Sequence, residues 1–208
     1  RVPIGTEKYT LITPKAIAVE TNGRVWAATE RGLQSLKPDT QQWLVEADTH
    51  LGGVLNQSPA ASLVAAPGGG LWLTHGFDLL HYDGTTVTSL MGPPADSGCG
   101  LGPLQIDSAG DLWAAGYRCG VWQYRAASND WQGHQTNQYI DQLAVGADGT
   151  LVALTGDGQL LARSLTGDWS TLGTVDRTVD VVMVSDQRGG AWLASRYTGE
   201  LWHYRSGG

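Results

Sequence analysis

A short motif recurs five times along the chain at a nearly constant distance. It consists of a glycine, any residue, an aliphatic residue and then Trp or Val, and its last position falls at residues 26, 72, 113, 152 and 192. The spacings are therefore 46, 41, 39 and 40 residues. Repeats of this length are typical of propellers and other repeat architectures, in which one supersecondary unit is copied along the chain.

Each repeat is expected to form a four-stranded antiparallel unit. An apolar run precedes the glycine hairpin, the Trp-containing strand follows it, an alternating stretch such as Gly120–Tyr124 comes next, and a more polar fourth stretch ends most repeats. Asn22-Gly23 and Asp148-Gly149 are standard signals for two-residue hairpins. We expect the Trp residues to pack between adjacent units. Val152 replaces Trp in the fourth repeat, which predicts the weakest packing there.

These units predict an all-β protein, a five-bladed β-propeller formed by a single domain of residues 1–208. The fifth repeat lacks a fourth strand, and an unassigned strand at residues 8–12 precedes the first repeat. We therefore expect the N-terminal strand to complete the last blade and close the ring, which removes exposed sheet edges. The predicted blades span residues 16–60, 61–101, 102–139, 140–178 and 179–208.

Composition agrees with short strands and tight turns. The 208 residues include 29 Gly and 9 Trp but one Phe, a bias that disfavours a helical bundle. The net charge of -7 gives no basic footprint for nucleic acid or an anionic membrane surface. No apolar run approaches the roughly 18 residues of a membrane span. Because the chain starts at Arg1, we expect a processed or trimmed polypeptide.

The segments Gly110–Trp113 and Gly120–Tyr124, and Gly23–Leu33 in the first repeat, carry a family resemblance. They resemble the two-component-regulator propeller repeat of extracytoplasmic bacterial sensors, and they are also similar to the repeats of streptogramin-lyase-like propellers. The resemblance spans residues 16–205 and implies a propeller fold and a sensor role. The catalytic His and Glu pattern of the lyases has no match here, so no catalytic residue is carried over.

Two connections, residues 47–61 and 91–103, are too long for simple turns and indicate binding loops on one face of the propeller. Cys99 lies in the second of these loops and Cys119 in a hairpin of the third repeat, so both thiols are expected on this face. A disulfide between them would indicate an oxidising, extracytoplasmic setting. The alternative is a pair of unrelated buried thiols.

The inner strands, aligned on Val19, Ala65, Ile106, Val145 and Val184, place three ionisable residues beside the channel mouth: Lys15, Asp141 and Asp180. Such a group could bind a cation or sugar hydroxyls, or perform acid and base chemistry. The alternative is that these residues cap strand ends. Hairpin tips add further candidates for carbohydrate or peptide recognition on the same rim: His75, Phe77, Asp78, Tyr117, Arg118, Arg196 and Tyr197.

The five His residues are predicted to share no recurring position, and no metal-binding or phosphate-binding motif occurs, so neither a metal nor a cofactor is expected. The sequence therefore favours a non-enzymatic recognition or sensor module. Its expected partner is a small molecule, a carbohydrate, a peptide or a protein. Two alternatives stay open: a carbohydrate-active hydrolase or lyase that uses Asp141 and Asp180, and a structural protein-interaction scaffold.

Overall fold

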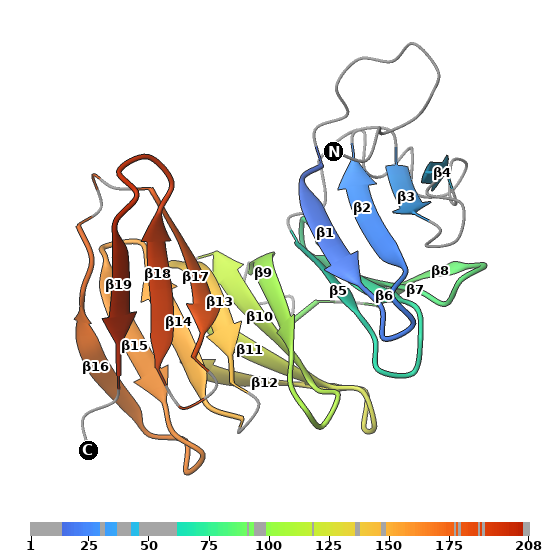
Figure 1. The fold of residues 1–208 in the computed structure, drawn as a ribbon. Helices are drawn as coiled ribbons and strands as arrows, with labels where there is room; N and C mark the ends of the chain where they lie inside the picture. Colours follow the sequence, from blue (N-terminus) through green and yellow to red (C-terminus); the bar gives the residue numbers. More distant parts are fainter. Residues whose placement is uncertain are drawn as a thin grey trace. The chain divides into compact units, whose positions relative to one another are not determined.

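The fold is described from a computed structural model, whose strands are shown in Figure 1. The structure describes residues 14–29, 32–36, 43–45, 62–90, 92–93, 99–117, 119–135, 138–146, 149–176, 178, 180–186, 188 and 190–205. The predicted N-terminal strand, the loop 47–61 and Arg118 lie outside these residues. Ring closure by the N-terminal strand therefore stays a prediction.

The described residues form five antiparallel sheets, each built from strands that are consecutive in the chain. Blade 1 contains β1 (Ala16–Val19), β2 (Val25–Thr29), β3 (Gly32–Leu36) and β4 (Trp43–Val45). Blade 2 contains β5 (Ser62–Ala65), β6 (Leu71–His75), β7 (Asp78–Tyr82) and β8 (Val87–Leu90). Blade 3 contains β9 (Gly100–Ile106), β10 (Leu112–Tyr117), β11 (Gly120–Arg125) and β12 (Asp130–Gln135).

Blade 4 contains β13 (Ile140–Val145), β14 (Leu151–Thr155), β15 (Gln159–Arg163) and β16 (Trp169–Thr174). Blade 5 contains β17 (Val181–Ser185), β18 (Ala191–Ser195) and β19 (Leu201–Tyr204). The predicted five-bladed β-propeller of antiparallel sheets is thus confirmed, with three strands described in the last blade. No helix among the described residues is long and apolar enough to cross a membrane.

The first-to-second-strand hairpins form where the repeated glycine permits them. Gly23 and Gly149 have φ values of 84° and 82°, a left-handed conformation that glycine adopts without a steric penalty. In blade 3 the side chain of Asp107 fixes the same hairpin. Its Oδ1 accepts hydrogen bonds from the backbone N–H of Ala109 (2.9 Å) and Asp111 (3.0 Å), and its Oδ2 accepts one from Trp113 Nε1 (2.9 Å). The turn and the neighbouring strand are therefore held by one carboxylate.

The chain forms two compact units, residues 1–92 with blades 1 and 2 and residues 93–208 with blades 3 to 5. Within each unit, adjacent blades share a core. Trp26 of blade 1 packs with Leu63 and Leu71 of blade 2, and Trp113 of blade 3 packs with Leu143 and Leu151 of blade 4. The predicted inter-blade role of these two Trp residues is confirmed.

Blade 4 is not the weakly packed blade that Val152 predicted. Every residue of β14 is buried, and Val152 packs with Ala191 and Leu193 of blade 5 in a shared cluster. The aliphatic side chain fits because the facing strand of blade 5 brings its own apolar residues to the interface. Trp192 of blade 5 is the more exposed side chain at this repeat position, at 38%.

Candidate functional site

Two exposed tyrosines lie side by side at one end of blades 3 and 4. Tyr117 is the last residue of β10, and Tyr139 directly precedes β13 in the next blade. Their ring centroids are 5.5 Å apart with an interplanar angle of 27°, a stacked arrangement. The two residues are 41% and 42% exposed. They offer a flat aromatic surface to solvent, and we call them the tyrosine pair.

A pocket of about 390 Å³ adjoins the tyrosine pair, and it is lined by Gln138, Tyr139, Thr155, Gly156 and Asp157. The β14–β15 turn approaches the ring of Tyr139 closely because residue 156 is a glycine. A Cβ at that position would lie 2.5 Å from Tyr139 Cδ1. The Gly156 N–H donates to the Tyr139 carbonyl at 2.7 Å, which fixes the turn against the ring.

The pocket combines a charged and a neutral acceptor. A hydrogen bond from the Thr155 hydroxyl to Asp157 is the main cause that lowers the pKa of this carboxyl group, and the backbone N–H of Gln159 adds to it. Asp157 is therefore ionised at neutral pH. The side-chain Oε1 of Gln138 is buried and has no hydrogen-bond partner among the described residues. Both groups suit a ligand that brings hydroxyl or amine donors.

A disulfide between Cys99 and Cys119 lies next to the tyrosine pair. The Cα atoms are 5.8 Å apart, within the usual span of such a bond. It ties the residue before β9 to the β10–β11 turn, directly beyond Tyr117. The carbonyl of Cys119 also accepts a hydrogen bond from Trp122 Nε1 at 3.1 Å. The aromatic surface is thus attached to a cross-linked segment, and the pairing proposed from the sequence is the one that the structure forms.

Asp180, Arg196 and Tyr197 lie together at the equivalent end of blade 5. Arg196 Nε is 3.4 Å from Asp180 Oδ2, with the two side chains 55% and 53% exposed, and the Arg196 N–H donates to the Asp180 carbonyl at 2.9 Å. Tyr197 follows in the hairpin tip and is 83% exposed. This part of the predicted site is an exposed ion pair beside an exposed ring.

The expected equivalence of Asp141 and Asp180 is wrong. In blade 5, Val181 pairs with Ser195, so Asp180 stands before the strand. In blade 4, the register shifts between Ile140 and Gln142, and Asp141 occupies that irregularity inside β13. The alignment of Val145 with Val184 is also off by one residue, because Val145 and Ser185 hold the corresponding places beside the hairpin. The bulge adds a second residue, so the two carboxylates do not share a position in their blades.

The other predicted residues belong to the first unit and are described there by themselves. Phe77 lies in the β6–β7 turn and is 63% exposed, and Asp78 begins β7. His75 ends β6, and its Nε2 is buried without a hydrogen-bond partner among the described residues. Lys15 precedes β1, and its backbone N–H donates to Ala28 at 2.9 Å.

Gln138, Tyr139 and Asp157 were not predicted from the sequence. Tyr139 follows a fourth strand, whereas the aromatic candidates were expected in hairpin tips. The signal available for Asp157 was the Thr155-Gly156-Asp157-Gly158 turn, which occupies the tip position in blade 4. In the part of the chain that is described, no group of three or more His, Cys, Asp or Glu residues is placed to hold a metal ion.

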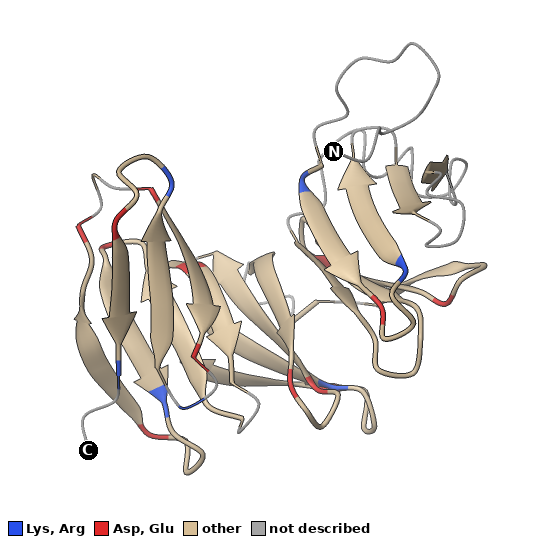
Figure 2. Ribbon diagram, in the orientation of Figure 1, with Lys and Arg blue, Asp and Glu red and all other residues tan. Residues whose placement is uncertain are grey.

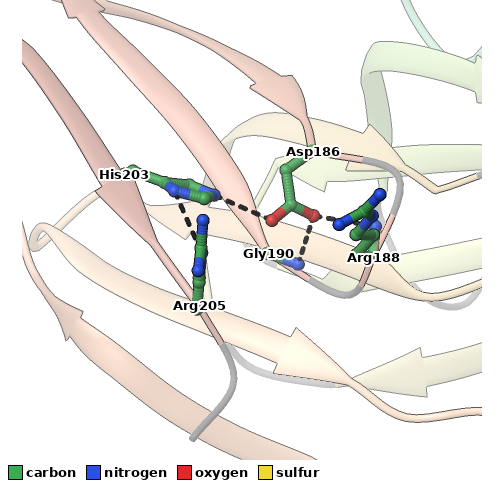
Figure 3. A network of polar contacts seen from close by, with 5 residues as sticks. All are labelled: Asp186, Arg188, Gly190, His203 and Arg205. Carbon is green, nitrogen blue, oxygen red and sulfur yellow. Dashed lines mark hydrogen bonds and ion pairs between the residues drawn. The ribbon is translucent and has the colours of Figure 1, made fainter.

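A second polar cluster lies at the opposite end of blade 5 (Figure 3). Asp186 accepts hydrogen bonds from His203 Nε2 and from the backbone N–H groups of Arg188 and Gly190, each at 2.8 Å. Arg205 Nε donates to His203 Nδ1 at 3.1 Å, so the neutral imidazole carries its proton on Nε2. Burial raises the pKa of Asp186, but the hydrogen bonds from His203 and the two backbone groups outweigh it and lower the pKa.

Solved structures with the same fold include both kinds of propeller that the repeats resemble. Virginiamycin B lyase from Staphylococcus aureus matches with a TM-score of 0.68 and 13% identity, over 92% of this chain and 69% of that chain. The extracellular domain of BT4673 from B. thetaiotaomicron, described as a hybrid two-component system, matches with a TM-score of 0.71 and 16% identity over 99% of this chain. The corresponding domain of BT3049 matches with a TM-score of 0.63 and 16% identity over 90% of this chain.

This chain spans 29% of the BT4673 domain and 26% of the BT3049 domain. At these identities the likeness concerns the propeller fold, and the resemblance seen in the repeats is confirmed at that level. No protein-family model and no curated protein sequence matches the chain.

Proposed function

We propose that this chain is a ligand-recognition module of the sensor-propeller kind, which binds a small ligand rich in hydroxyl groups at the tyrosine pair. The observation that carries the proposal is the stacked, exposed arrangement of Tyr117 and Tyr139 beside a pocket of about 390 Å³. Aromatic faces pack against the C–H face of a sugar or other polyol ring, and nearby acceptors bind its hydroxyl groups.

The residues around the pair support recognition more directly than catalysis. Asp157 is ionised by its own hydrogen bonds, and Asp180 pairs with Arg196 while both remain exposed. A hydrolase with two carboxylates needs one of them protonated at neutral pH, commonly through burial. A carbohydrate or a hydroxylated small molecule is therefore the ligand class that we propose, in place of a hydrolase or lyase substrate.

We further propose an extracytoplasmic location. The Cys99–Cys119 disulfide is stable in oxidising compartments, and the sensor domains that share the fold are described as extracellular. If the location is extracytoplasmic, thiol titration of freshly isolated protein should find Cys99 and Cys119 oxidised.

The test is isothermal titration of the oxidised chain with a panel of monosaccharides, oligosaccharides and short peptides. Tyr139→Ala removes half of the stacking surface, and we expect it to weaken binding about fivefold, since one stacked ring contributes about 1 kcal/mol. Tyr117→Ala should act in the same direction. The matched control is Tyr197→Ala, which removes an exposed ring from blade 5 and should leave the affinity unchanged.

Three results would overturn the proposal. They are the absence of binding by every member of the panel, equal effects of Tyr139→Ala and Tyr197→Ala, and turnover of a bound sugar by the wild-type chain. The last result would instead support the hydrolase or lyase alternative.

A further inference from the structure

Three arginines gather at the end of blades 4 and 5 opposite the tyrosine pair. Arg163 ends β15, Arg188 lies in the β17–β18 hairpin, and Arg205 follows β19. Figure 2 shows basic segments at these ends of β15 and β19. The chain as a whole has 20 acidic and 13 basic residues, so a local group of three guanidinium groups departs from its overall charge.

Arg163 and Arg188 line one pocket of about 350 Å³. The same pocket is bordered by four residues with hydroxyl groups: Thr150, Ser164, Thr166 and Ser170. Arg188 also lines an adjoining pocket of about 360 Å³, together with Arg205 and His203. Arg188 therefore borders both pockets, one shared with Arg163 and the other with Arg205.

The guanidinium of Arg163 is held in place by the neighbouring blade. It lies 5.4 Å from the centre of the Trp113 ring, a cation–π contact with the neighbouring blade. Its Nε is buried and has no hydrogen-bond partner among the described residues. Burial lowers the pKa of Arg163 and the nearby Asp168 raises it, but a guanidinium stays protonated across the physiological range.

Two described carboxylates of this region, Asp186 and Asp168, are engaged by their own hairpins. Asp186 accepts hydrogen bonds from His203 and from the backbone at Arg188 and Gly190 (Figure 3). Asp168 Oδ2 accepts the Thr166 hydroxyl at 2.7 Å.

We propose that the Arg163–Arg188 pocket binds a tetrahedral oxyanion, the phosphate or sulfate group of a small molecule. Guanidinium groups donate parallel N–H bonds that match the oxygens of such groups. The site is separate from the tyrosine pair and goes beyond the ligand-recognition role proposed for it.

The experiment is isothermal titration of the full oxidised chain with inorganic phosphate and, separately, with sodium sulfate, with sodium chloride at matched ionic strength as the reference. We expect saturable binding of at least one of the two oxyanions and none of chloride. Arg188→Gln should weaken the binding about tenfold, because it removes a charge-assisted contact. The matched control, Arg196→Gln, removes an exposed guanidinium at the other end of blade 5 and should leave the affinity unchanged.

Arg163→Lys keeps the charge but removes the planar fork, and it should also weaken binding while the chain stays folded by circular dichroism. If Arg188→Gln fails to fold, Arg188→Lys takes its place with the same expectation. The proposal is overturned if neither oxyanion binds above the chloride reference, or if the Arg188 and Arg196 variants lose affinity equally. Tyr139→Ala serves as an independent marker, since its effect on oxyanion binding should be nil.

Discussion

Three of the described His residues pack against Trp rings. His81 and His203 lie directly across the antiparallel ladder from Trp72 and Trp192, with ring centroids 4.2 Å and 4.0 Å apart. The prediction that no His position recurs is therefore wrong. The two residues stand nine and eleven positions after their Trp because the intervening hairpins differ in length, so sequence spacing concealed the pairing. The dipeptide His-Tyr, present at both sites, was the available signal.

His134 reaches Trp113 from the fourth strand of blade 3, and its pKa is strongly lowered. Its ring stacks on Trp113 at 4.8 Å, and its Nε2 lies 2.8 Å from Gln123 Oε1. Burial, followed by the positive charges of Arg163 and Arg125, lowers the pKa of His134 from 6.5 to about 4. The imidazole is therefore neutral in the folded protein at conditions under which an unfolded chain would already protonate it.

This difference predicts a dependence of stability on pH. With a folded pKa below the unfolded one, the contribution of His134 to the free energy of unfolding is fully present above pH 6.5 and is lost as the pH falls from 6.5 to about 4. NMR titration of the His134 ring measures its pKa in the folded protein, and urea unfolding at pH 7 and 4.5 measures the change in the free energy of unfolding. The His134→Asn variant should lose less unfolding free energy between these two pH values than the wild-type chain. A midpoint near 6.5 for His134 would contradict the expectation.

The strands show where prediction from spacing succeeds. The hairpin glycines and the residues that follow them were predicted because a tight turn fixes the register of the two strands it joins. Register at the far strand ends is set by bulges instead. Shifts occur between Ala114 and Gly116 and between Ile140 and Gln142, and a spacing argument that starts from the hairpin does not detect them. The tyrosine pair was missed for a related reason, because it joins residues of two blades.

The bulge in the β9–β10 pairing lies next to the disulfide, and Gly116 makes room for the bond. A Cβ at Gly116 would overlap the sulfurs of both Cys99 and Cys119. Gly116→Ala should therefore prevent the bond or displace the turn. The 20-residue separation between the cysteines implies a cost of about 3 kcal/mol in unfolding free energy, from the lost constraint on the unfolded chain.

Thiol titration in denaturant and thermal unfolding measure the effect of Gly116→Ala. The matched control is Gly68→Ala, because a Cβ at Gly68 meets nothing within 4 Å and its φ is not in the left-handed region. Two free thiols and a lower Tm are expected for the first variant and neither for the second. An intact disulfide with an unchanged Tm in Gly116→Ala would show that the turn relaxes at little cost.

At the scale of the molecule, the repeat predicted the fold because every blade contains the same sequence motif at the same hairpin. Five copies of strand, turn and strand, each with an apolar pair shortly after the glycine, leave few architectures other than a propeller. The single-domain organisation, the N-terminal strand and the two long loops depend on segments that carry no copy of the motif. These three features stay predictions. The identity of the ligand also stays a prediction, because the rim residues that would contact it differ from blade to blade and follow no repeated pattern.

The overall charge predicts the pH at which the chain associates with itself. With a net charge of -7 at pH 7 and an isoelectric point near 5.0, molecules repel at neutral pH and lose that repulsion near pH 5. Light scattering between pH 4 and 8 should show maximal association near pH 5, aided by exposed apolar side chains such as Val184 and Leu201. Arg196→Gln should move the maximum to lower pH. A maximum near pH 7 would disagree with this account.

The irregularity at Asp141 bears on how such a chain can diverge. A strand that already contains one extra residue relative to its partner strand can lose or gain a residue at that point while the hydrogen bonds nearer the hairpin keep their partners. Insertions and deletions at the rim are then tolerated, and the length of a repeat can drift, as the spacings from 39 to 46 residues do, while the buried positions stay fixed. The rim of the blades is thereby free to evolve faster than the core that carries it.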